Sequence, residues 1–132
     1  MNGVVDEWVE KAEEDFRAAH LTVEAAEPIP SVAVFHSQQC AEKYLKAYLT
    51  EHRVEFRPRH ELEPLRRLIV AFDADIDEFA DDLDLISDYA VDVRYPGRSA
   101  TLDEAKEALA AATRVRAFVR LKLGLDATPA TP

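Results

Sequence analysis

The residues from Phe35 to Leu49 limit most strongly how this chain can fold. The stretch contains no glycine or proline, and its apolar residues recur at steps of three and four. That spacing is the pattern of one buried face of an α-helix. The residues that form this face are Ala41, Tyr44, Leu45, Tyr48 and Leu49. We therefore expect these residues to form a helix of a packed bundle.

Polar residues interrupt and flank this apolar face. Towards the N-terminus the face passes through Val34 and Gln38, so an amide falls where a hydrophobic side chain is expected. A buried amide must be hydrogen-bonded, and Gln38 is therefore predicted to meet a polar partner or to lie at an interface. On or near a second, polar strip of the same helix lie His36, Gln39, Lys43 and Lys46.

Proline and glycine divide the rest of the chain into further helical segments. With only three glycines and no strand-like alternation, the sequence predicts an all-α protein. Its architecture should be an antiparallel up-and-down bundle of four to five helices. Residues 1–124 are expected to form a single domain, and residues 125–132 a disordered C-terminal tail. The predicted helices span residues 5–26, 31–53, 60–72, 76–93 and 101–123, the last opening with a capping box.

Charge and cysteine content exclude several classes of function. The net charge of −10 argues against broad binding of nucleic acid, and no contact with DNA is expected. Nine acids and no basic residue lie between Asp73 and Asp92, whereas arginines cluster between Arg53 and Arg67. The sole cysteine, Cys40, cannot form an intramolecular disulfide, and no apolar run approaches the ~20 residues of a membrane span. We expect a cytoplasmic protein without membrane contact.

Few chemical functions are supported by motifs in this sequence. It has no glycine-rich phosphate loop, no HExxH motif and no cysteine cluster, so neither a metal nor a cofactor is expected. The polar strip could instead converge with Arg57 and His60 in the loop before the third helix, and with Arg94 and Tyr95 after the fourth. Such a group would suit a phosphate or another anion. The predicted anion-binding or nucleotide-binding residues are Arg94, Tyr95, Lys43, Lys46, Gln39 and Arg57.

The Phe35–Leu49 segment resembles the motif Phe-His-x-Gln-Gln-Ala-Ala-Glu-Lys-x-Leu-Lys-Ala-x-Leu of HEPN domains, named as higher-eukaryote and prokaryote nucleotide-binding domains. Three other segments are similar to the family and follow in its order: an early helix with Trp8 and residues 12–16, His60–Leu62, and Arg94–Pro96. The resemblance implies an all-α bundle that forms a homodimer. It also implies a minimal nucleotidyltransferase as partner in a two-component, toxin–antitoxin-like system, with a nucleotide or RNA as candidate ligand.

The ribonuclease branch of this family has an arginine followed by four to six residues and a histidine. In this sequence no histidine follows Arg94, so the resemblance does not transfer that catalytic assignment. We therefore expect a nucleotide-binding or partner-binding module rather than an enzyme. Two alternatives stay open. One is a metal-independent ribonuclease toxin with a variant site, for which Arg94, His60 and His36 are the candidate catalytic residues, and the other is a non-catalytic dimerisation bundle.

Overall fold

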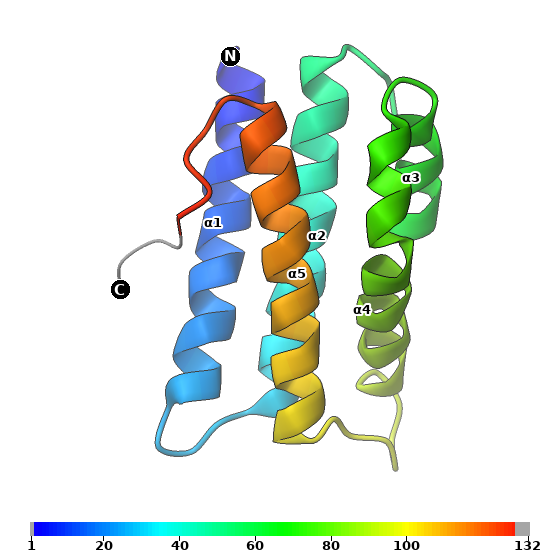
Figure 1. The fold of residues 1–132 in the computed structure, drawn as a ribbon. Coiled ribbons are helices and arrows are strands. Elements are labelled where there is room, and N and C mark those ends of the chain that lie inside the picture. Colours follow the sequence, from blue (N-terminus) through cyan, green and yellow to red (C-terminus); the bar gives the residue numbers. More distant parts are fainter. Residues whose placement is uncertain (1, 129–132) are drawn as a thin grey trace.

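The computed structural model describes residues 2–128 and contains helices and no strand within that range, which confirms the all-α prediction. The long helices run up and down along a common direction (Figure 1). The elements in chain order are α1 (Gly3–Glu24), α2 (Pro30–Glu51), α3 (Leu62–Val70), the 3₁₀ helix η1 (Ala74–Phe79), α4 (Ala80–Asp92) and α5 (Leu102–Lys122).

The boundaries follow from local signals in the sequence. Asn2 caps α1, because its side chain accepts a hydrogen bond from the backbone N–H of Val5. Helix α2 begins at Pro30, and the lack of an N–H on proline costs nothing there, because the first N–H groups of a helix have no acceptor within it. The expected capping box at α5 is present. The Thr101 hydroxyl accepts from the Glu104 N–H, and the Glu104 carboxylate accepts from the Thr101 N–H.

The fourth helix differs from the prediction at its start. Residues 76–79 were expected to be α-helical, but they belong to η1, and α4 begins only at Ala80. The Asp73 carboxylate caps the turn by accepting the Asp75 N–H at 3.1 Å, and this tight local turn favours 3₁₀ geometry over α geometry. Ile76 within η1 is nevertheless fully buried and anchors the segment to the core.

Helix α2 lies at the centre of the bundle and packs against α1, α3, α4 and α5. Thirteen of its 22 residues are buried, among them Tyr44, Leu45 and Leu49 of the predicted apolar face. Phe16 from α1, Ile86 from α4 and Val115 from α5 complete the same core. Because α2 has neighbours on several sides, its polar residues must find partners inside the bundle.

A buried arginine joins α1, α5 and the C-terminal segment. Arg116 is only 1% exposed, and its guanidinium donates to both carboxylate oxygens of Glu13, at 2.7 and 2.8 Å. It also donates to the backbone carbonyls of Ala127 and Thr128, each at 3.0 Å. Residues 125–128 of the expected tail therefore have a described course along the bundle, while residues 129–132 lie outside the described range. Whether the tail is disordered stays a prediction.

The Glu13 carboxylate is held ionised by these contacts. Burial alone would raise its pKa, but hydrogen bonds from Arg116 and Tyr44 outweigh burial and hold the pKa below the usual value of 4.5. Stabilisation by this carboxylate is therefore present above the unfolded-state pKa and is lost as the pH falls through the lower folded-state value.

Replacement of Arg116 by methionine should lower the free energy of unfolding by about 3 kcal/mol, because Glu13 and two carbonyls lose their donor. Urea denaturation measures this change. The matched control is Arg114→Met on the same helix, since Arg114 forms an exposed pair with Asp82 and its loss should cost less than about 1 kcal/mol. Equal losses for the two variants would show that the buried pair has no special role.

Candidate functional site

The polar strip of α2 is largely neutralised by a carboxylate from α1. Asp15 is buried, and one of its oxygens lies 2.7 Å from Nδ1 of His36 while the other accepts from Nζ of Lys43 at 2.6 Å. These bonds fix α1 against α2, because each partner comes from the other helix. The residues Asp15, His36 and Lys43 thus form an interhelical contact in the interior of the bundle.

A second buried carboxylate, Glu42, organises the other polar residues of α2. It accepts from Nζ of Lys46 at 2.9 Å, and Nδ1 of His60 lies 3.3 Å from it. Gln38 donates to Glu42 at 3.3 Å and to the backbone carbonyl of His60 at 2.7 Å. The polar partner predicted for Gln38 is therefore present. Through these bonds α2 holds the loop that precedes α3.

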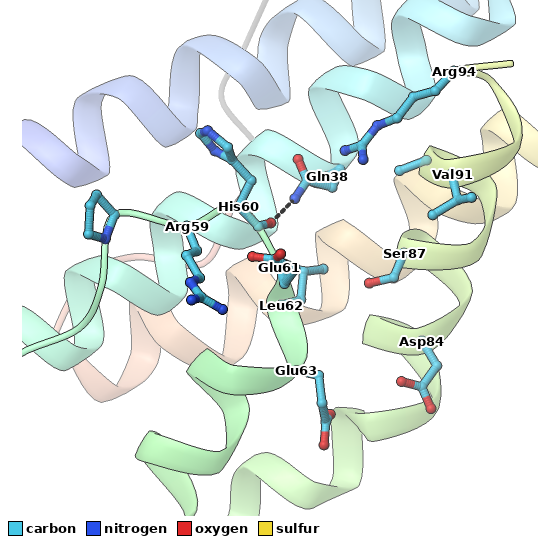
Figure 2. Close-up of a pocket in the computed structure, with 12 residues that line it drawn as sticks. Gln38, Arg59, His60, Glu61, Leu62, Glu63, Asp84, Ser87, Val91 and Arg94 are labelled. Carbon is cyan, nitrogen blue, oxygen red and sulfur yellow. Dashed lines mark hydrogen bonds between the residues drawn. The ribbon is translucent and has the colours of Figure 1, made fainter.

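Beside this loop lies a pocket of about 680 Å³ between α2 and α4 (Figure 2). Its walls come from Gln38 of α2, from residues 58–63, and from one stripe of α4 that continues past the end of that helix. The residues of this stripe are Asp84, Ser87, Ala90, Val91 and Arg94. Their spacing of three and four places them on one side of the helix, facing the loop.

Charged groups of both signs line this pocket without neutralising one another. Among residues 2–128, no side-chain hydrogen bond or ion pair engages Arg59 or Arg94, nor the carboxylates of Glu61 and Asp84. Glu63 differs, because Arg66 and Arg67 donate to it. Those hydrogen bonds lower the pKa of Glu63 to about 2. Figure 2 shows the Arg94 side chain directed towards Gln38, with Ser87 and Asp84 further along α4.

The residues proposed from the sequence come together only in part. His60 and Arg94 line this pocket, whereas His36, Lys43 and Lys46 are engaged by Asp15 and Glu42. Gln39 donates to Gln38 and Glu42. The residues that sequence reasoning missed are Arg59, Glu61, Asp84 and Ser87.

The two other predicted residues lie apart from these contacts. Arg57 lines a neighbouring hollow with Phe56 and Leu68, and Tyr95 is exposed after the end of α4. For Asp84 and Ser87 the signal was the three- and four-residue spacing of positions 84, 87, 91 and 94, and for Arg59 it was the arginine cluster between Arg53 and Arg67. That spacing lies within an acidic run that otherwise looks like a solvated face.

Candidate nucleophiles and metal ligands do not gather at the pocket. Burial raises the pKa of the Cys40 thiol, so this residue stays protonated and acts as a packing residue. Among residues 2–128 no group of three or more histidine, cysteine, aspartate or glutamate side chains is placed to hold a metal ion. Within the same range no helix has the length and apolar character needed to cross a bilayer.

Fold and pocket together define a small antiparallel helical bundle with a polar cleft between its central helix, a loop and its fourth helix. The HEPN domain family model matches residues 5–122 of this sequence. The chain therefore belongs to the HEPN domain family, and the resemblance inferred from residues 35–49 is confirmed.

A solved structure agrees with this assignment. The crystal structure of an archaeal HEPN homologue is similar to this chain with a TM-score of 0.68 and 30% sequence identity. The match covers 90% of this chain and 97% of the archaeal one. A search of curated proteins gives no match.

Proposed function

We propose that this HEPN domain binds a nucleotide in the pocket between α2 and α4. The observation that supports this proposal is the pair of unpaired guanidinium groups, Arg94 and Arg59, at one cavity. A guanidinium donates two parallel hydrogen bonds to a phosphate, and it stays charged at every physiological pH. The volume of about 680 Å³ lies in the range of small-molecule sites.

The protein is further proposed to act as a symmetric homodimer. Phe35 on α2 is 55% exposed, and the exposed Val32 lies beside it on the same helix. Val91 and Tyr95, at the end of α4, are exposed as well. Three of these apolar residues belong to the two helices that flank the pocket and Tyr95 follows the second of them, and a second copy would remove all four from water.

A minimal nucleotidyltransferase is the partner that we propose for this dimer, in a two-component, toxin–antitoxin-like system. Membership of the HEPN family supports this proposal, together with the Phe-His-Ser-Gln-Gln segment of α2 and the Arg-Tyr-Pro segment after α4. In such a pair the HEPN domain would present its nucleotide pocket, and the enzymatic step would belong to the partner.

The ribonuclease alternative has less support from the geometry. His60 lines the pocket with Arg94, but its ring points away from Ser87 and Asp84, and its Nδ1 lies beside the buried carboxylate of Glu42 (Figure 2). A general base must reach the proton that it removes. The carbonyl of His60, rather than its ring, is the group hydrogen-bonded at the pocket wall.

The Arg94→Gln variant should bind nucleoside 5′-monophosphates about tenfold more weakly than the wild type, because it loses a charge-assisted hydrogen bond to phosphate. Isothermal titration calorimetry at low salt measures the dissociation constants. The matched control is Arg17→Gln, an exposed arginine of α1 outside the pocket, which should bind as the wild type does. Absence of binding by the wild-type protein would refute the nucleotide pocket.

The Phe35→Asp variant should be monomeric at micromolar concentration, where the wild type should have the mass of a dimer. A carboxylate at the centre of an apolar contact would lose its hydration without gaining a partner. Light scattering coupled to size-exclusion chromatography measures the mass. Leu21→Asp, a substitution at an exposed leucine of α1, is the control and should stay dimeric. A monomeric wild type would exclude the homodimer.

Affinity-tagged protein purified from its own host should retain a minimal nucleotidyltransferase, identified by mass spectrometry of the intact proteins and of bound small molecules. The tag expressed alone is the control. Recovery of the HEPN dimer without any such enzyme would count against the two-component system. The remaining functions would then be ligand binding or dimerisation alone.

A further inference from the structure

Within residues 2–128, the α2–α4 pocket is lined by unpaired charges of both signs. Six of the eleven arginines in the sequence pair with a carboxylate. Arg94 is one of the other five, so the lack of a carboxylate partner is common among the arginines that the structure describes. Within the described chain, Arg94 and Asp84 line one pocket, and neither side chain has a hydrogen-bonded or ion-paired protein partner. A cavity with an unpaired cation and an unpaired carboxylate is complementary to a ligand that has an anionic group at one end and hydrogen-bond donors at the other.

The helix geometry explains why these two groups do not neutralise each other. Asp84 lies in the first half of α4, the helix ends at Asp92, and Arg94 follows in the turn. The rise of the helix separates Asp84 from that end by about 12 Å. A ligand that contacts both groups must be extended, with an anion at the Arg94 end and N–H donors at the Asp84 end. The Ser87 hydroxyl lies between them (Figure 2).

A nucleoside monophosphate has this order of groups: phosphate, ribose hydroxyls, base. The two oxygens of an aspartate accept two adjacent N–H donors, and among the common bases guanine offers such a pair, its ring N1–H and its 2-amino group. Adenine and cytosine have an amino group beside a ring nitrogen that only accepts hydrogen bonds, and the lone pair of that nitrogen repels a carboxylate oxygen. A longer polyanion is disfavoured by the carboxylates of Glu61, Glu63 and Asp84 and by the net charge of −10.

We infer that this pocket selects a guanine nucleotide, with the phosphate on Arg94, the ribose beside Ser87 and the guanine edge on Asp84. This inference rests on the proposed function of the pocket and adds the identity of its ligand. Asp84 is then the residue that determines specificity, while Arg94 supplies affinity that is the same for every base.

The test compares guanosine, adenosine, uridine and inosine 5′-monophosphates on the full chain by isothermal titration calorimetry. Guanosine monophosphate should bind about tenfold more tightly than the adenosine and uridine compounds, because only guanine donates a pair of hydrogen bonds to the exposed carboxylate of Asp84. Inosine monophosphate lacks the 2-amino group and should lie between them. Asp84→Asn should abolish the preference for guanine, whereas Arg94→Gln should weaken all four ligands by the same factor.

The control is Asp88→Asn, one turn further along α4, exposed and outside the pocket lining. It should keep both the affinity and the preference of the wild type. Equal binding of all four nucleotides would overturn the guanine assignment and leave the nucleotide pocket intact. Tighter binding of every nucleotide by Asp84→Asn would also overturn it, because Asp84 would then only repel phosphate. Failure of all four nucleotides and of inorganic phosphate to bind would instead refute the proposed function.

Discussion

The structure depends on the neutralisation of polar groups along the central helix. Because α2 packs against all four other α-helices, its histidine, lysine and glutamine side chains cannot all reach water. Asp15 from α1 accepts from Lys43 and lies against His36, and Glu42 accepts from Lys46 and Gln38. A buried charge without its partner costs several kcal/mol. These bonds therefore fix how α1 and the loop before α3 lie against α2.

This arrangement divides the family-like residues between structural contacts and the pocket, because His60 and Arg94 line the pocket while most polar residues of α2 do not. The string of polar residues in α2 is directed mainly to structural contacts, and its Gln38 alone reaches the pocket wall. The groups free to meet a ligand come from the loop at residues 58–63 and from α4. The buried bonds of Glu42 and Gln38 hold the loop that carries Arg59, whereas Arg94 follows the end of α4, and both guanidinium groups are exposed.

The sequence was sufficient to predict where the helices lie, but it was insufficient to predict which side chains contact one another between helices. Apolar spacing located the buried face of α2, and the Thr101–Glu104 capping box located the start of α5. The same spacing placed Lys43 on a polar strip but could not show that Asp15 of α1 lies opposite it. The local geometry of two segments could not be predicted from the sequence either. Asp73 caps the turn that makes residues 74–79 a 3₁₀ helix, and Arg59 lines two neighbouring hollows whereas Arg57 lines only one of them.

Electrostatics at two ranges would allow this acidic protein to bind an anion at the proposed site. At distances beyond roughly one Debye length, about 8 Å at physiological salt, a ligand meets the net charge of −10, which disfavours long polyanions. In contact with the pocket, a single phosphate meets the guanidinium of Arg94, with no competing carboxylate bound to it among the described residues. A small anion with one charged end gains the short-range attraction and suffers little of the long-range repulsion. A nucleic acid strand suffers that repulsion at every phosphate. The missing histidine after Arg94 and the surrounding carboxylates therefore both support the proposed nucleotide site over the alternative of RNA cleavage.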